Sequence, residues 1–160
     1  MSEVIRVGMA ELKVARAPGR IVTLGLGSCL GVCAYDSVQK VGGMVHIMLP
    51  DSSLAIGPTN PAKFADTGVP FLMEEMIKHG ASLRSITVKI VGGAEMFNTG
   101  GSETHLAVGE RNIAAVEETC RKFKIPIAAK SVGGHAGKSV TLNLDTGAVE
   151  VKSMNEVFML

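Results

Sequence analysis

The sequence predicts an α+β fold in which strands outnumber helices. Short apolar runs rich in β-branched residues are separated by glycine and proline turns, which is typical of β-strands. Only two segments place apolar residues at the spacing of an amphipathic helix. The chain has 160 residues, 46% of them hydrophobic, so it can bury a sizeable core without disulfides. We therefore expect a single domain over residues 1–160.

The first third of the chain is predicted to consist of strands. Alternating or continuous apolar runs mark five of them, at residues 4–7, 12–14, 21–24, 30–35 and 44–49. A turn at Pro18-Gly19 precedes the third strand, which leads into a glycine-rich segment. The fourth and fifth strands flank the polar residues 36–40, so we expect them to form a hairpin that ends before Pro50.

Two helices and the remaining strands follow. The first helix is predicted to begin at Asp66 or Thr67 and to end at His79, before Gly80. The second is predicted from about Arg111 to Phe123, after a loop from Asn98 to Thr104. Strands are expected at residues 86–91 and 127–132, and a terminal hairpin at 140–144 and 149–152 around a Asp-Thr-Gly turn.

Composition narrows the function classes. The formal net charge is +1, with basic and acidic residues interspersed, which favours neither nucleic acid nor an anionic membrane as a partner. There is no Trp, one Tyr and five Phe, so base-stacking platforms are not expected. No apolar run approaches the roughly 20 residues of a membrane span. Three cysteines and no recognisable signal peptide predict a cytoplasmic protein.

The glycine-rich segment Thr-Leu-Gly-Leu-Gly-Ser-Cys-Leu-Gly, residues 23–31, is the most informative part of the chain. It places Cys29 on a turn whose glycines allow sharp bending and close approach to a bound group. His46 lies 17 residues beyond the cysteine (46 − 29), on the expected neighbouring strand. A thiolate is the reactive form of cysteine, and a nearby imidazole can generate it. The pattern predicts a cysteine nucleophile.

The expected hairpin tests whether the cysteine and the histidine can meet. One register pairs Asp36 with Gln39 and places Cys29 directly opposite His46. A longer loop pairs Asp36 with Val41 and places Cys29 two residues along the strand. Because side chains alternate between faces with a period of two, both registers put the thiol and the imidazole on the same side of the sheet. The intermediate register would separate them.

Thr23 lies on the preceding strand near the same turn, where its hydroxyl could orient the imidazole. Each of the three residues also has a structural interpretation. A cysteine is often simply buried, which is what we expect of Cys33 and Cys120. A histidine on an apolar strand, such as His46, is often a core residue, and threonine is a common strand former. Their convergence with Cys29 at one turn favours a catalytic set.

Other motifs in the sequence are weaker. Residues 27–31 fit the Gly-x-nucleophile-x-Gly pattern of α/β-hydrolases, but a strand rather than a helix is expected to follow. Residues 133–139 are one residue short of a phosphate-binding loop and also precede a strand. A zinc site formed by Cys29, Cys33 and His46 lacks a fourth ligand at a recognisable spacing.

Several segments together resemble the CheD family of bacterial and archaeal chemotaxis proteins. The resemblance runs in order from about residue 4 to residue 152. Its first two motifs are the most specific in combination. The segments are Val-Thr-Leu-Gly-Leu-Gly-Ser-Cys at 22–29, Gly-Gly-Met-Val-His-Ile-Met-Leu-Pro at 42–50, Gly-Gly-Ala-Glu-Met-Phe at 92–97, Gly-Glu-Arg-Asn-Ile at 109–113 and Gly-Gly at 133–134.

The resemblance implies hydrolysis of selected glutamine side chains of chemoreceptors to glutamate, with release of ammonia. It implies that Cys29, His46 and Thr23 form the catalytic set, that no metal or cofactor is needed, and that the substrate is the cytoplasmic helical bundle of a receptor. The implied fold is a layered α/β sandwich of mainly antiparallel strands, similar to the cysteine deamidase domains of some bacterial toxins. Family members can bind the phosphatase CheC. Two alternative functions remain open at this point. One is a non-catalytic regulator of that phosphatase, and the other is a different cysteine acyl-transfer enzyme, such as an amidase or transglutaminase.

Overall fold

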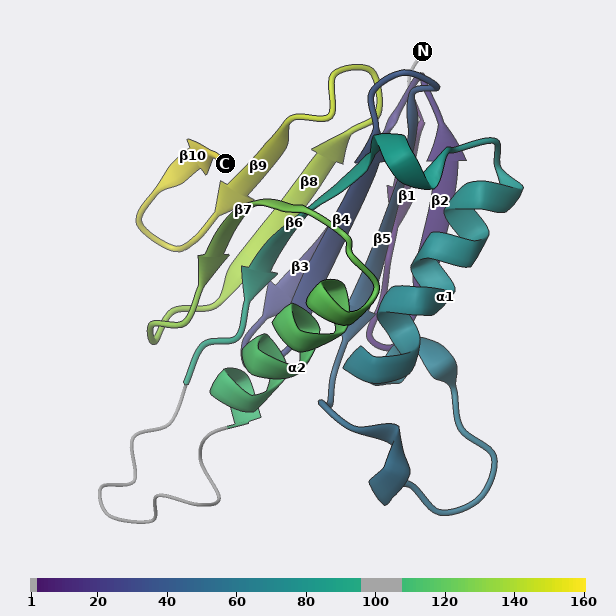
Figure 1. Ribbon diagram of the computed structural model, residues 1–160. Helices are drawn as coiled ribbons and strands as arrows, with labels where there is room; N and C mark the ends of the chain where they lie inside the picture. The colour runs from purple at the N-terminus through teal and green to yellow at the C-terminus, as the bar shows by residue number, and fades with distance from the viewer. Residues whose placement is uncertain (1–2, 96–107) are drawn as a thin grey trace.

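A computed structural model describes residues 3–95 and 108–160 and shows three layers (Figure 1). Two five-stranded sheets pack face to face, and two helices cover one of them. The helices are α1 (Ala65–Lys78) and α2 (Val108–Lys122). The strands are β1 (Val4–Arg6), β2 (Leu12–Arg16), β3 (Arg20–Leu26), β4 (Leu30–Asp36), β5 (Val41–Ile47), β6 (Ile86–Gly92), β7 (Ile127–Val132), β8 (Lys138–Asn143), β9 (Val149–Lys152) and β10 (Val157–Met159).

The strands divide into an outer sheet and a central sheet. The outer sheet has the order β1-β3-β8-β9-β10, and the central sheet has the order β2-β5-β4-β6-β7. Among the described strands, β1–β3 and β6–β7 pair in parallel and the other neighbours pair antiparallel. The predicted α+β sandwich of mainly antiparallel strands with two principal helices is therefore confirmed.

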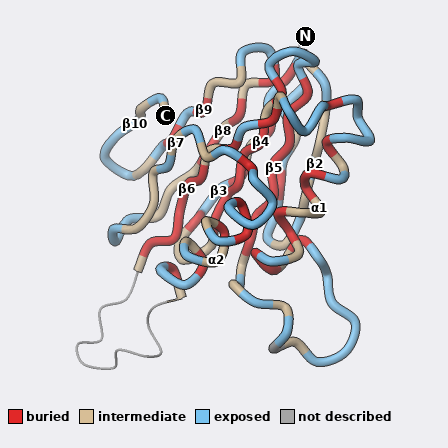
Figure 2. The backbone as a smooth tube through the Cα atoms, in the orientation of Figure 1, coloured by how far each residue is buried: buried red, intermediate tan, exposed pale blue. Residues whose placement is uncertain are grey.

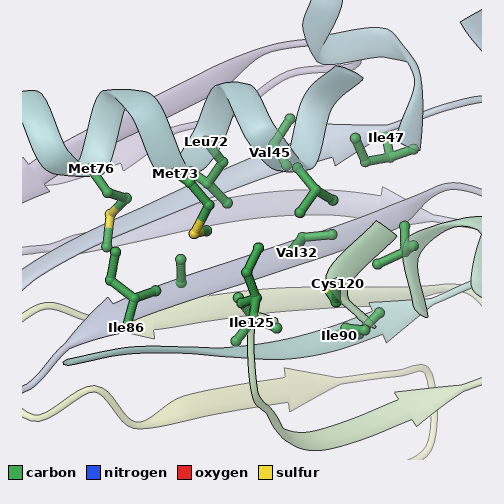
Figure 3. Packing of buried hydrophobic residues seen from close by; sticks show 14 of the residues in the cluster. Val32, Val45, Ile47, Leu72, Met73, Met76, Ile86, Ile90, Cys120 and Ile125 are labelled. Carbon is green, nitrogen blue, oxygen red and sulfur yellow. The ribbon is translucent and has the colours of Figure 1, made fainter. Parts of the chain in front are cut away.

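The central sheet is buried on both faces, which explains why its strands are almost continuously apolar. Figure 2 shows β4, β5 and β6 buried along most of their length. On one face, alternate residues such as Val32, Val45 and Ile90 pack against α1 and α2 (Figure 3). On the other face, residues such as Cys33 and Met44 pack against the outer sheet. The side chains on this second face are the ones that the site uses.

Residues 44–49 were expected to be one strand, but β5 runs from Val41 to Ile47. It ends earlier than expected because the N–H groups of Met48 and Leu49 both donate to the carbonyl oxygen of Lys63, at 2.8 and 3.0 Å. The chain then passes through two short 3₁₀ helices, η1 (Ser52–Leu54) and η2 (Pro61–Lys63), before α1 begins. The segment between β5 and α1 is thus tied to the end of β5.

The helix α2 begins at Val108, three residues before the predicted start at Arg111. The prediction was wrong because Gly109 suggests a break. In the structure Gly109 is buried inside the first turn, and a Cβ there would collide with the carbonyl oxygen of Gly93. The lack of a side chain at Gly109 lets α2 pack closely against the loop after β6. Phe123, the expected last residue of the helix, follows it instead and is 45% exposed.

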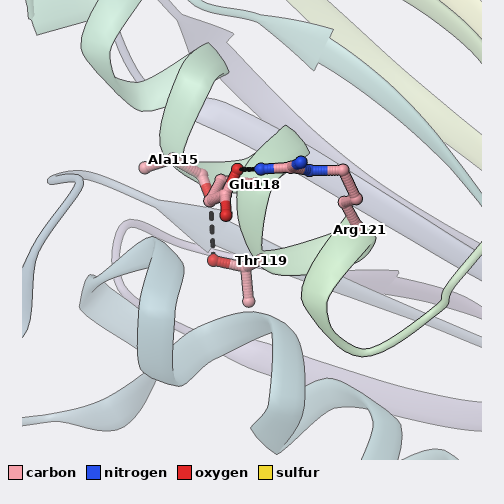
Figure 4. A network of polar contacts seen from close by, with 4 residues as sticks. All are labelled: Ala115, Glu118, Thr119 and Arg121. Carbon is pink, nitrogen blue, oxygen red and sulfur yellow. Dashed lines mark hydrogen bonds and ion pairs between the residues drawn. The ribbon is translucent and has the colours of Figure 1, made fainter.

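The last turns of α2 show how polar side chains are accommodated there (Figure 4). The hydroxyl of Thr119 donates to the carbonyl oxygen of Ala115 at 2.7 Å, so this threonine can be buried without an unsatisfied donor. Glu118 and Arg121 form an ion pair on the exposed side of the helix. Exposed pairs of this kind contribute little to stability.

The second half of the chain otherwise follows the prediction. The strand at 127–132 and the terminal hairpin of β8 and β9 are confirmed, while the tail beyond residue 152 adds the unexpected edge strand β10. The loop expected from Asn98 to Thr104, and the last two residues of the Gly-Gly-Ala-Glu-Met-Phe motif, lie outside the described residues. Neither described helix is long and apolar enough to cross a membrane.

Candidate active site

The turn that carries Cys29 connects the outer sheet to the central sheet and is held through its carbonyl oxygens. The carbonyl oxygen of residue 27 accepts a hydrogen bond from the N–H of Ala94 (2.8 Å), and that of residue 29 accepts one from the N–H of Gly93 (2.9 Å). Between them, the carbonyl oxygen of residue 28 accepts a hydrogen bond from the side-chain amide of Asn112 (2.9 Å). All three donors come from the loop after β6 or from α2. The turn is therefore fixed by segments more than 60 residues away in the sequence.

Fixing the carbonyls also fixes the direction of the N–H groups. In a planar trans peptide the N–H points opposite to the preceding carbonyl, so the N–H groups of Ser28 and Cys29 point away from α2 and β6. Within residues 3–95 and 108–160, neither donates a hydrogen bond to another backbone group or to a side chain. Two adjacent donors beside a cysteine are the arrangement that stabilises an oxyanion.

A close contact explains why Gly92 ends β6. Its φ is +116°, and a Cβ on this residue would overlap the carbonyl oxygen of Cys29. Only glycine lets the strand pass so near the turn in this backbone conformation. The sequence shows Gly92-Gly93 as the end of a strand but does not show that this end touches the cysteine.

The register of the β4–β5 hairpin is the longer-loop alternative. Asp36 pairs with Val41, and Gly31 pairs with His46. Cys29 therefore lies two residues along from the partner of His46, on the face that packs against the outer sheet. The expectation that the thiol and the imidazole share one face is confirmed.

Asp36 stabilises this register. It is fully buried, and its carboxylate accepts hydrogen bonds from the N–H groups of Val38 (2.9 Å), Gln39 (3.0 Å) and Ser82 (2.8 Å). Burial alone would raise the pKa of Asp36, but the three backbone donors, Ser82 foremost, outweigh it and lower the pKa. The ionised carboxylate thus holds the loop that sets how β5 faces β4.

Thr23 and His46 meet across the space between the sheets. The Oγ1 of Thr23 lies 2.8 Å from the Nδ1 of His46 and 2.7 Å from the carbonyl oxygen of Val7. A carbonyl only accepts, so the single hydroxyl proton goes to Val7, and Thr23 must accept from a protonated Nδ1. The neutral imidazole then carries its lone pair on Nε2. This is the tautomer that a general base needs.

Burial controls the charge of both reactive groups. His46 is 2% exposed, and its burial lowers its pKa below the ordinary value of 6.5. Partial burial raises the pKa of the Cys29 thiol. Both shifts favour a neutral thiol beside a neutral imidazole over a thiolate–imidazolium pair. In the resting site, the proton therefore stays on sulfur.

The structure brings Thr23 into contact with His46 but leaves Cys29 without a hydrogen bond to the imidazole. The Nε2 atom of His46 is buried and has no hydrogen-bond partner among the described residues. Hydrogen bonds between catalytic groups are often absent before substrate binds and form in the complex. A cavity of about 270 Å³, lined in part by Met9 and Leu24, reaches His46.

Asn112 is a residue of this site that the sequence analysis did not identify. It is fully buried in α2, and its side-chain nitrogen donates to the carbonyl oxygens of Ser28 (2.9 Å) and Met48 (3.0 Å). The amide orientation is fixed, because a flipped amide would face two acceptors with an oxygen. Asn112 thereby joins the residue before Cys29 to the segment just after His46.

A signal for Asn112 exists in the sequence. It lies four and eight residues before Val116 and Cys120, so it belongs to the buried face of the helix. A polar side chain on such a face requires a partner. Its Oδ1 is buried and unpartnered among the described residues.

The three cysteines differ sharply in environment. Cys33 and Cys120 are buried, as expected, and burial raises their pKa to about 12 and about 11. Cys29 is only partly buried, so it is the one thiol that a substrate can approach. Within the described parts of the chain, no three His, Cys, Asp or Glu side chains are grouped so as to hold a metal ion, and the zinc alternative has no support.

Comparisons with known proteins agree with the resemblance seen in the sequence. The family model for CheD, described as CheD chemotactic sensory transduction, matches residues 48–153. The chain belongs to the CheD family. The match to the CheD model begins two residues after His46, so it does not itself include the three candidate catalytic residues.

Relatives cover the chain more fully. A protein of Clostridium tetani is 45% identical over 149 residues, covering 93% of this chain and 90% of the relative. One of Syntrophomonas wolfei is 44% identical over 154 residues, covering 96% of both chains. One of Desulfitobacterium hafniense is 44% identical over 155 residues, covering 97% of this chain and 96% of the relative. All three are named probable chemoreceptor glutamine deamidase CheD.

Proposed function

We propose that this protein deamidates glutamine side chains of chemoreceptors, with Cys29 as nucleophile, His46 as general base and Thr23 as the positioning residue for His46. The observation that carries the proposal is the chain of hydrogen bonds from Nδ1 of His46 through Thr23 to the carbonyl of Val7. It leaves Nε2 as the proton acceptor on the face that also carries Cys29. The names of the relatives supply the substrate class.

The reaction begins with proton transfer. As Sγ of Cys29 attacks the carboxamide carbon, its proton passes to Nε2 of His46, because neither group is ionised at rest. The carbonyl oxygen becomes an oxyanion, which the N–H groups of Ser28 and Cys29 stabilise. The imidazolium then protonates the departing nitrogen, so that ammonia leaves and a γ-glutamyl thioester remains.

Hydrolysis completes the cycle. Water attacks the thioester carbon, and Nε2 of His46 takes one of its protons as the C–O bond forms. The C–S bond breaks, and the proton returns to the sulfur of Cys29. The product is a glutamate side chain, and no metal or cofactor enters any step.

The substrate in this proposal is the cytoplasmic helical bundle of a receptor, which places the protein in the cytoplasm. Conversion of a glutamine to a glutamate adds a negative charge to an exposed helix surface. Such a surface is open and extended, so binding must come from a docking region as well as from the catalytic turn.

The test is mass spectrometry of a purified receptor cytoplasmic fragment after incubation with the protein and its variants. The wild type is expected to replace NH₂ by OH at specific glutamines, and Cys29→Ser is expected to abolish this. Thr23→Val should lower kcat by about 10- to 100-fold, part of the effect of general-base catalysis, while Thr23→Ser retains the hydroxyl and most of the rate. Equal activity of Thr23→Val and Thr23→Ser would contradict the assigned role of Thr23.

The same experiment separates the alternatives. An amidase or transglutaminase acting on amines would add the mass of the amine to the glutamine. A non-catalytic partner of a CheC-type phosphatase would leave the receptor fragment unchanged with both the wild type and Cys29→Ser. Loss of deamidation in Cys29→Ser alone supports the enzyme.

A further inference from the structure

A groove lies beside the site, between the segment after β5 and the start of α2. Its volume is about 590 Å³, within the range of ligand-binding clefts. Phe64, 4% exposed, lies buried at its base, and the side chains of Leu49 and Ile56, 38% and 99% exposed, contribute apolar surface. Single exposed apolar residues are common on protein surfaces, but here they gather at one concave place.

The groove is built onto the segments that hold the catalytic residues. Leu49, which lies three residues after His46 in the chain, forms an isolated β-bridge with Phe64. Arg111 lines another part of the groove, and it is the neighbour of Asn112, whose amide holds the turn before Cys29. The walls of the groove are therefore joined to the turn of Cys29 and to the end of β5 through the side chain of Asn112, which donates to the carbonyl oxygens of Ser28 and Met48.

The charge of the groove is positive. Lys63 and Arg111 both line it, and neither forms an ion pair with any residue in the described parts of the chain. The one acidic residue of the lining, Asp51, accepts a hydrogen bond from the N–H of Ser53 at 2.8 Å and stays ionised, so the lining side chains carry a net charge of +1 (two cations and one anion). Lys63 also lies over the ring of Phe64, 5.8 Å from its centre, which places a cation beside the apolar floor.

We propose that this groove binds the substrate helix itself, as an amphipathic helix with apolar side chains facing Leu49, Ile56 and Phe64 and a carboxylate facing Lys63 and Arg111. Helices dock into grooves in this way through apolar anchors spaced three or four residues apart. The inference rests on the proposed function for the identity of the helix. In this proposal, contacts in the groove provide most of the affinity for the substrate, and the turn of Cys29 provides the chemistry.

The first measurement is binding of a fluorescently labelled receptor cytoplasmic fragment to the Cys29→Ser protein, which cannot turn over. Ile56→Ser removes an apolar side chain, and Arg111→Glu reverses a charge. Each is expected to weaken binding about 10-fold. Leu83→Ser and Arg84→Glu are the matched controls, because these adjacent residues are exposed and follow the C-terminal end of α1, whereas the groove lies at its N-terminal end, and both are expected to bind like the parent.

The second measurement shows that the groove variants act on binding. In the active protein, Ile56→Ser and Arg111→Glu are expected to raise KM for the receptor fragment about 10-fold with kcat unchanged. The rate at which iodoacetamide alkylates Cys29 should equal that of the wild type, which shows that the turn is intact. Added salt should weaken binding less in Arg111→Glu than in the wild type.

The outcomes distinguish this inference from the proposed function. If the wild type deamidates the fragment and both groove variants bind it like the controls, the groove assignment is overturned and the activity stands. If the wild type does not deamidate the fragment but binding depends on Ile56 and Arg111, the groove assignment is supported and the activity fails. Binding of a purified CheC-type phosphatase through these two residues, with no dependence of receptor binding on them, would overturn the choice of partner.

Discussion

Replacing Asn112 by Asp should make the stability of this protein depend on pH in a way that the wild type does not show. The substitution keeps the shape of the side chain but places a carboxyl group where an amide now donates to two carbonyl oxygens, at 2.9 and 3.0 Å. The site is fully buried. Desolvation and the two carbonyl dipoles both disfavour the ionised form, so the pKa of the new carboxyl must rise on folding.

The structure sets the size of the effect. A protonated carboxyl has one O–H and can serve only one of the two carbonyls, so the variant loses about 1–3 kcal/mol at every pH. Above about pH 3.9 the unfolded chain releases the proton while the folded protein keeps it, so stability falls by about 1.4 kcal/mol per pH unit. A carboxyl that is still protonated at pH 7 therefore adds a loss of about 4 kcal/mol.

Urea unfolding between pH 5 and pH 8 measures this loss, with Asn112→Ala as the control. Asn112→Ala removes both hydrogen bonds of the amide and adds no titratable group, so titration of His46 and other residues cancels in the pH dependence of the difference between the variants. The free energy of unfolding of Asn112→Asp should fall below that of Asn112→Ala by an amount that grows with pH. A difference that is constant with pH, or an Asn112→Asp protein as stable as the wild type at pH 7, would refute the reasoning.

Three further predictions concern the surroundings of the site. Gly92→Ala should cost at least about 2 kcal/mol more than Gly133→Ala in thermal unfolding, because both glycines have positive φ but only a Cβ at Gly92 collides with Cys29; equal losses would contradict the close contact. Because burial lowers the pKa of His46, the wild type should lose stability as pH falls from about 6.5 to the folded pKa, by at most about 1.4 kcal/mol per pH unit, and His46→Gln should lack this contribution in urea titrations. Asp36→Asn should lower the free energy of unfolding at pH 7 by about 1–3 kcal/mol in urea titrations, because one oxygen that accepts a backbone N–H is replaced by an NH₂ donor. A change below about 0.5 kcal/mol would show that the β4–β5 loop does not depend on the carboxylate.

The site could be predicted from the sequence as far as local geometry reaches. Alternation along strands reduced the β4–β5 hairpin to two acceptable registers, and both put Cys29 and His46 on one face. The choice between them could not be made locally. It depends on Asp36, whose carboxylate reaches the N–H of Ser82, 46 residues further along the chain.

The helix α2 shows why the rest could not be predicted. A glycine within the first turn usually argues against a helix, but Gly109 is required because the helix packs directly on the carbonyl of Gly93. Because α2 begins at Val108, Asn112 lies within the helix, buried, with its side-chain amide against the carbonyl oxygen of Ser28. Contacts between such distant segments are set by tertiary packing, which neither propensity nor periodicity describes. The short edge strand β10 was missed because three half-exposed residues carry almost no periodic signal.

The hydrogen bond between Thr23 and His46 joins a strand of the outer sheet to a strand of the central sheet. Its length therefore depends on the distance between the two sheets. At 2.8 Å it tolerates a separation of only about half an ångström before it weakens. If the apolar layer around Met44 and Val140 loosens, the hydrogen bond that orients the imidazole therefore weakens before the strands themselves separate. On warming, we expect turnover to decline below the melting temperature while the circular dichroism of the sheets is still unchanged.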